Sequence, residues 1–295
     1  MINASTATSS QDARGAMAER TVLVTGANSG VGFAAARNLA GQGARIVMVC
    51  RDRKRGEQAR AQLAEHASAA PPELLIADLS SQADVRALAD AVRAQYERID
   101  VLLNNAGAVF GKRELSVDGI EKTFATNHLA PFLLTNLLLD LLRSAPGGRV
   151  VTVASEIYSR KLDFDNLQGE RSYRFFKAYQ RSKLCNVLFA YELARRLDGE
   201  GVTSNVVSPG PSKTGFGRDM TGLPLLFTRV MKSTPRFGTP ENGARTLVYA
   251  ASEPALADVS GRFFYKSKEL RTKPITHDLA TAARLWEISA ELCPT

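Results

Sequence analysis

The stretch TGANSGVG, residues 25–32, decides how the N-terminal half of this chain is interpreted. It continues the β-branched run RTVLVTG (20–26) and places glycines at Gly26, Gly30 and Gly32. A short strand that ends in such a turn and leads into a helix brings backbone N–H groups and a helix N-terminus up to a pyrophosphate. Strand-to-helix turns favour glycine in any case, so the spacing alone is a weak indication. Its position after the first strand of a βαβ unit favours a nucleotide-binding turn.

The same alternation of apolar runs and helical periods continues along the chain. Further apolar runs cover 44–50, 72–78, 99–105, 148–155, 201–208 and 261–265. Segments with a helical period cover 30–42, 53–66, 81–97, 118–143, 175–198, 240–252 and 278–291. Apolar strands separated by amphipathic helices are typical of a parallel sheet that is buried on both faces. The sequence therefore predicts an α/β, doubly wound (Rossmann) three-layer domain with a parallel sheet of about seven strands.

Composition limits the classes of function. Of the 295 residues, 44% are hydrophobic and 23% charged, as in soluble globular proteins. The net charge is +8, but the basic residues are scattered and no recognition motif occurs, so nucleic-acid binding is not expected. Three cysteines without a CxxC pair indicate a reducing compartment, and we expect a cytoplasmic protein. The three histidines lack ligand spacing, so no metal site is expected.

The N-terminus and one later segment stand apart from the alternating pattern. Residues 1–19 are polar and rich in small side chains, which predicts a disordered tail rather than a signal peptide or membrane anchor. The remainder, 20–295, is expected to form a single domain. Segment 211–238 is apolar for an irregular stretch, and long loops of compact domains are commonly functional.

The end of the second apolar run bears on the choice of nucleotide. A carboxylate there would bind a ribose 2′-hydroxyl, whereas a 2′-phosphate repels a carboxylate and favours Arg. The sequence has Cys50 at this position, followed by Arg51 and Asp52. A bidentate contact between the Arg51 guanidinium and a phosphate is the preferred interpretation, so we expect NADP(H) rather than NAD(H). The alternative is that Arg51 is a solvated residue at a helix start.

Tyr and Lys occur four residues apart twice in SYRFFKAYQRSKLCNVLFAYELARRL (172–197), as Tyr173 with Lys177 and Tyr179 with Lys183. Positions six apart differ by about 240° around a helix, so both pairs cannot face one cleft. The stripe through Tyr179 and Lys183 continues with small apolar residues, which predicts that the second pair faces the sheet. A phenol ordinarily has a pKa of about 10, and a nearby ammonium group stabilises the phenolate. The second pair is therefore suited to exchange a proton with an alcohol or a carbonyl.

These motifs, in this order, resemble the classical short-chain dehydrogenase/reductase family over roughly residues 20–265. The matching segments are TGANSGVG, Asp78–Leu79, NNAG (104–107), ATNHLAPF (125–132), YQRSK (179–183) and VVSPGPSKT (206–214). DFDNLQGERSY and AYQRSKLCNVLFAYELARRL are similar to the retinol-dehydrogenase-like branch, although Ser208 stands where that branch frequently has histidine. The resemblance implies strand order 3-2-1-4-5-6-7 and the NAD(P)-dependent interconversion of an alcohol and a carbonyl.

The resemblance also implies roles for individual residues. Tyr179 would pass the proton, Lys183 would tune Tyr179 and hold the ribose, Ser155 would hydrogen-bond the substrate oxygen, and Asn127 would support a relay water. Together with Arg51, the expected cofactor-binding residues are Gly26, Asn28, Ser29, Gly30, Val31, Gly32, Asp78, Leu79, Asn105, Ala106, Gly107, Tyr179, Lys183, Pro209, Gly210 and Thr214.

The expected activity is that of a ketone or aldehyde reductase acting on an apolar small molecule. Segment 211–238 is then a lid over a hydrophobic substrate, or alternatively a contact with a membrane surface or a second subunit through Arg229, Lys232 and Arg236. The helices expected at 118–143 and 175–198 form dimer interfaces in relatives, so a homodimer stays open. Two other functions stay open: an NADP-binding redox sensor or scaffold without turnover, and a retinol-type dehydrogenase at a membrane surface.

Overall fold

Eight strands form a single sheet in the computed structural model, which describes residues 17–211 and 238–294. The strands are β1 Thr21–Thr25, β2 Arg45–Cys50, β3 Glu73–Ile76, β4 Val101–Asn104, β5 Gly148–Val153, β6 Val202–Ser208, β7 Phe263–Tyr265 and β8 Lys268–Glu269. Their order is β3-β2-β1-β4-β5-β6-β7-β8, and β1 to β7 pair in parallel. The predicted α/β doubly wound architecture and strand order are confirmed.

The eighth strand is an addition to the predicted sheet. It pairs antiparallel with β7 through a turn in which Lys266 and Ser267 have φ angles of 52° and 55°. Hairpin turns with two residues at positive φ strongly favour Asn-Gly or Asp-Gly. Because this turn has neither, the sequence carries no signal for the hairpin.

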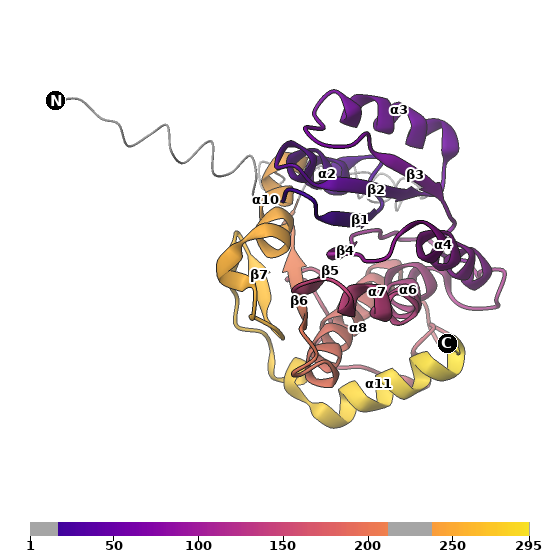
Figure 1. Cartoon of the computed structure of the whole chain (residues 1–295). Helices are drawn as coiled ribbons and strands as arrows, with labels where there is room; N and C mark the ends of the chain where they lie inside the picture. The colour runs from indigo at the N-terminus through magenta and orange to yellow at the C-terminus, as the bar shows by residue number, and fades with distance from the viewer. Residues whose placement is uncertain (1–16, 212–237, 295) are drawn as a thin grey trace.

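The helices cover both faces of the sheet (Figure 1). They are α2 Gly30–Gly41, α3 Arg53–Ala64, α4 Gln82–Gln95, α5 Lys122–Phe124, α6 Ala130–Leu137, α7 Leu139–Arg143, α8 Phe175–Arg196, α10 Pro240–Ser252 and α11 Leu279–Leu292. Shorter turns are the π-helix η1 Ala125–Leu129 and the 3-10 helices η2 Phe164–Asn166, η3 Pro254–Leu256 and η4 Pro274–His277. Helices α2, α3 and α10 enclose one apolar cluster, and α4, α6, α8 and α11 enclose the other.

Side chains at the helix starts explain where several of these helices begin. Asp52, Ser81, Thr239 and Asp278 each precede a helix and accept a hydrogen bond from a backbone N–H of its first turn. These N–H groups have no partner within the helix, and Ser, Thr or Asp at this position supplies one. The loops between strands and helices thus end at defined residues, which fixes the geometry of the sheet edge that they form.

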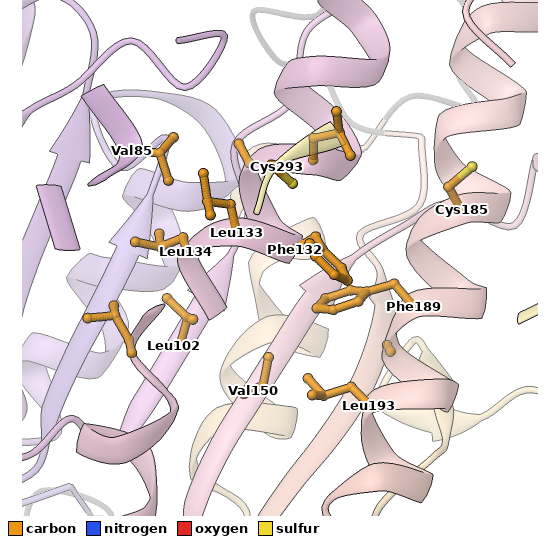
Figure 2. Close-up of a cluster of buried hydrophobic side chains, with 14 of the residues drawn as sticks. Val85, Leu102, Phe132, Leu133, Leu134, Val150, Cys185, Phe189, Leu193 and Cys293 are labelled. Atoms are coloured by element: carbon orange, nitrogen blue, oxygen red, sulfur yellow. The ribbon is translucent and has the colours of Figure 1, made fainter. Parts of the chain in front are cut away.

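The C-terminal helix α11 packs on the outer face of α8. The rings of Phe132 from α6 and Phe189 from α8 lie side by side, with centroids 5.7 Å apart (Figure 2). Trp286 of α11 contacts both rings, at 4.9 and 5.9 Å, and His128 Nε2 lies 2.9 Å from Ser289 Oγ. His128 is therefore a helix-packing residue, and α11 is part of the core.

The described residues begin within the predicted tail. Of the expected tail 1–19, residues 1–16 lie outside the described residues, but Met17 is buried and its N–H donates to the Gln42 carbonyl at 3.2 Å. Most of the expected lid 211–238 also lies outside the described residues. Its two described ends meet, because the Gly238 N–H donates to the Pro211 carbonyl at 2.8 Å. Within the described ranges, no helix combines the length and apolar character that crossing a membrane requires.

Candidate active site

A cleft of about 410 Å³ lies along the carboxyl ends of the parallel strands. Its walls come from the loops that follow β1, β2, β3, β4, β5 and β6, and from the first turns of α8. Open α/β sheets bind ligands at this edge, where the strand order reverses between β1 and β4. The predicted residues that line it are Gly26, Asn28, Ser29, Val31, Gly32, Arg51, Asp78, Leu79, Asn105, Ala106, Gly107, Ser155, Tyr179, Lys183, Pro209 and Gly210.

The glycine turn is packed too closely for side chains. Gly26 has φ +69°, and a Cβ on Gly32 would lie 2.3 Å from Asn105 Nδ2 and 2.5 Å from the Gly26 carbonyl oxygen. Asn105 itself donates from Nδ2 to the Thr25 carbonyl at 2.7 Å. The turn therefore brings the N-terminus of α2 close to the strand ends and leaves backbone facing the cleft. This cradle fits a pyrophosphate.

Thr25, which the sequence did not single out, ties the turn to the next loop. Its Oγ1 donates to the Leu103 carbonyl at 3.2 Å and accepts from the backbone N–H groups of Asn105 and Ala106, both at 3.0 Å. One hydroxyl thus fixes the start of the segment 105–107, whose three residues were expected to bind the cofactor.

The end of the cleft beside β2 contains two arginines and a carboxylate that caps a helix. Arg51 and Arg55 both line it. Asp52 Oδ1 accepts the Arg55 backbone N–H at 2.9 Å, as the N-cap of α3. The Asp52 carboxylate is therefore used within the protein. Arg55 was not among the predicted site residues, although it belongs to the densest cluster of basic residues in the sequence.

At the opposite end, Tyr179 and Lys183 of α8 face the cleft together. Lys183 is buried, its Nζ donates to the Val153 carbonyl at 3.0 Å, and the same Nζ lies 5.7 Å from the centre of the Tyr179 ring. Ser155, just after β5, hydrogen-bonds with Tyr179 and accepts the Ile157 N–H at 3.1 Å. This arrangement brings a phenol, a hydroxyl and an amine to one end of the cleft.

The pKa values of this group differ from the expected direction. Burial raises the pKa of Tyr179 to about 12; the hydrogen bond from Ser155 opposes the rise, and the negative charge of Glu156 adds to it. Burial also lowers the pKa of Lys183 to about 8. The expected lowering of the Tyr179 pKa is thus not seen in the protein alone, where loss of hydration is the largest effect on the phenol.

Asn127 lies behind the cleft wall rather than in it. Its Oδ1 accepts the Ala108 N–H at 2.7 Å, and its Nδ2 donates to the Ala108 carbonyl at 2.9 Å and to Ser182 Oγ at 3.0 Å. It belongs to the π-helix η1, a distortion that occurs frequently at functional sites. Asn127 therefore joins the loop after β4 to α8. Gly30 does not line the cleft either, and Thr214 lies outside the described residues.

The first Tyr–Lys pair does not enter the cleft. Tyr173 precedes α8, and its hydroxyl donates to the Phe110 carbonyl at 3.0 Å and lies 3.3 Å from Glu121 Oε1. Lys177 is exposed on the outer side of the helix. Tyr173 thus holds the loop after β4, as a residue at the helix entry.

Several residues that complete the site were not predicted from the sequence. Phe110, Ile157 and Phe176 form an apolar wall near Ser155 and Tyr179, and Phe176 stacks on Tyr179 with centroids 6.5 Å apart. Glu156 lines the same end, and its carboxylate accepts a hydrogen bond from Ser208 Oγ. Only the position of Phe176, one turn before Tyr179, pointed to the cleft.

Comparisons with known proteins agree with this geometry. The sequence model described as short chain dehydrogenase matches residues 20–221. The chain belongs to the short-chain dehydrogenase family. Human (Homo sapiens) retinol dehydrogenase 14 is 44% identical over 93% of this chain and 86% of its own length. Human retinol dehydrogenase 12 is 37% identical, over 92% and 86%. The chain thus lies in the retinol-dehydrogenase-like branch of the short-chain dehydrogenases.

Solved structures of short-chain dehydrogenases share the fold. An uncharacterised protein from Mycobacterium paratuberculosis is 34% identical, with a TM-score of 0.76 and 94% of each chain covered. The RhlG/NADP active-site complex from Pseudomonas aeruginosa is 27% identical, with a TM-score of 0.66, over 86% of this chain and 96% of that chain. Family, branch and site together identify an NAD(P)-dependent oxidoreductase that acts on CH–OH groups.

Proposed function

We propose that this short-chain dehydrogenase is an NADPH-dependent reductase of apolar aldehydes or ketones. The observation that carries the proposal is the difference between the two ends of the cleft, one of which is charged and the other apolar. Two arginines and a carboxylate already used as a helix cap lie at one end, and an apolar wall around Tyr179 and Ser155 lies at the other. The first end suits a 2′-phosphate, which pairs with guanidinium groups and is repelled by a free carboxylate. The second end suits an apolar carbonyl compound.

The residues around the substrate oxygen have separate roles in proton transfer. A bound nicotinamide supplies the hydride in this family of reactions. The Ser155 hydroxyl polarises the carbonyl by donating a hydrogen bond to its oxygen, and Tyr179 delivers the proton to the same oxygen. Lys183, fixed by the Val153 carbonyl, places a positive charge beside the phenol and reaches toward the ribose. Asn127 holds the Ala108 backbone that faces these groups.

Retinaldehyde is a second candidate substrate, because retinol dehydrogenase 14 is 44% identical to this chain. The apolar side chains of Phe110, Ile157 and Phe176 would suit a polyene as well as a smaller apolar carbonyl compound. This candidate keeps the same residue roles and changes only the substrate.

A panel of apolar aldehydes and ketones, with retinaldehyde among them, tests the proposal through the loss of NADPH absorbance. We expect turnover of at least one class of apolar carbonyl, with a higher kcat/KM for NADPH than for NADH. Absence of turnover across the panel, with NADPH bound, would refute the reductase function. A preference for NADH would refute only the cofactor assignment.

A further inference from the structure

One carboxylate lies at the substrate end of the cleft. Among the described residues that line the cleft, the acidic side chains are those of Asp52, Asp78 and Glu156. Asp52 and Asp78 follow β2 and β3, at the nucleotide end. Glu156 follows Ser155 directly and stands beside the apolar wall. Among the described residues, a substrate that places its carbonyl near Tyr179 therefore meets one negative charge, that of Glu156.

Glu156 is held in this place by the end of β6. The buried Ser208 donates a hydrogen bond from Oγ to the Glu156 carboxylate, and the same Oγ accepts the Gly210 N–H at 3.2 Å. This hydrogen bond favours the position of the carboxylate beside the cleft. Its charge acts on the reacting group, because it contributes to the raised pKa of Tyr179.

Among the described residues, no ion pair involves Glu156. Lys183 Nζ donates to the Val153 carbonyl, and no ion pair joins Lys183 and Glu156 in the part of the chain described by the structure. The arginines Arg51 and Arg55 lie at the other end of the cleft. An anionic group on the substrate would thus add a like charge in a partly buried space, where charges interact more strongly than in water.

We propose that Glu156 is a specificity-determining residue that excludes carbonyl compounds carrying an anionic group and selects uncharged ones. The inference rests on the proposed reductase function and adds the charge of the substrate to it. It also assigns a purpose to the Ser208–Glu156 contact, which keeps the carboxylate beside the reacting end of the cleft.

A pair of aldehydes that differ only in charge provides the test: para-formylbenzamide and para-formylbenzoate. The quantity measured is the ratio of kcat/KM for the amide to that for the carboxylate, with NADPH at saturation. We expect the wild-type protein to favour the amide and the Glu156→Gln variant to lower the ratio about tenfold, since a like-charge repulsion at several ångströms is removed. Glu156→Asp keeps the charge and should keep the preference.

A glutamate outside the cleft controls for the change in net charge. Glu287 is exposed on α11, so Glu287→Gln should leave the ratio as in the wild type. An unchanged ratio in Glu156→Gln, with both aldehydes reduced, would overturn the inference and leave the proposed function intact. Equal loss of preference in Glu156→Gln and Glu156→Asp would overturn it as well, because the role would then depend on side-chain length. No reduction of either aldehyde by a protein that does reduce an apolar aldehyde of the panel would overturn this inference alone, whereas no turnover across the panel as well would refute the proposed function too.

Discussion

At Tyr179, burial and hydrogen bonding act on the phenol in opposite directions. Burial raises its pKa to about 12, and the hydrogen bond with Ser155 only partly offsets the rise. The side chain is consequently protonated at neutral pH, which is the form that donates a proton to a carbonyl oxygen. Phenolate formation, which oxidation needs, depends on positive charge beyond that of Lys183.

The two arginines at the β2 end allow a test of cofactor preference. Arg51→Ala and Arg55→Ala should each raise the Kd for NADPH about tenfold, because a charge-assisted contact with the 2′-phosphate is lost. The Kd for NADH should stay nearly unchanged. Fluorescence titration of both nucleotides measures this difference. Arg60→Ala is the matched control. Arg60 lies on α3, as Arg55 does, but it pairs with Glu57 at 2.8 Å outside the cleft. Equal weakening of NADH and NADPH would contradict the assignment.

Among the elements, α2 depends on a glycine at one defined position. A Cβ on Gly32 would clash with Asn105 Nδ2 at 2.3 Å and with the Gly26 carbonyl at 2.5 Å. Gly32→Ala should therefore lower the free energy of unfolding by about 1–3 kcal/mol and weaken NADPH binding. Gly41→Ala, at the other end of α2, should cause neither effect, because its nearest neighbour would be 3.9 Å away. Urea denaturation and NADPH titration compare the two variants. Equal free energies of unfolding and equal Kd values for NADPH would argue against close packing at Gly32.

The regular elements of the sheet were predictable because their signals are local. Strands such as β1 and β4 are buried along their whole length and appear as runs of mainly apolar or β-branched residues. Two elements had no such signal. The hairpin to β8 lacks a turn residue suited to positive φ, and the π-helix η1 interrupts an apolar segment whose pattern resembles one long helix. Both depend on tertiary contacts, which sequence periodicity does not report.

The same distinction holds for the site. Tyr179 and Lys183 could be named because their spacing has a chemical reason, and Ser155 could be named through the family resemblance. Glu156 and Phe110 could not, since their approach to the cleft follows from the course of the loops after β5 and β4. The sequence could not predict that the pKa of Tyr179 is raised, because this shift depends on how deeply the phenol is buried.

For the whole molecule, the core that joins α6, α8 and α11 contains a titratable group. Burial lowers the pKa of His128 to about 3, from a usual value of 6.5. The unfolded chain binds the proton more readily, so the contribution of His128 is fully present above pH 6.5 and is lost as the pH falls toward 3. Between pH 7 and pH 5 the loss should be about 2 kcal/mol.

Urea denaturation of the wild type and of His128→Phe at both pH values measures this contribution. The wild type should lose about 2 kcal/mol more than the variant on going from pH 7 to pH 5. His66 is exposed, so His66→Asn should follow the wild type. If the free energy of unfolding falls by the same amount from pH 7 to pH 5 in the wild type and in His128→Phe, His128 does not take up a proton on unfolding.

The central claim is that one hydroxyl, at Tyr179, delivers the proton to a bound carbonyl compound. The most direct test is Tyr179→Phe, with Tyr173→Phe as the control that removes the hydroxyl of the other Tyr–Lys pair. Steady-state reduction of an accepted aldehyde and NADPH titration are measured on both variants. We predict that Tyr179→Phe loses about a thousandfold or more in kcat while its Kd for NADPH stays close to that of the wild type. A Tyr179→Phe protein that reduces the aldehyde as fast as Tyr173→Phe would contradict the account.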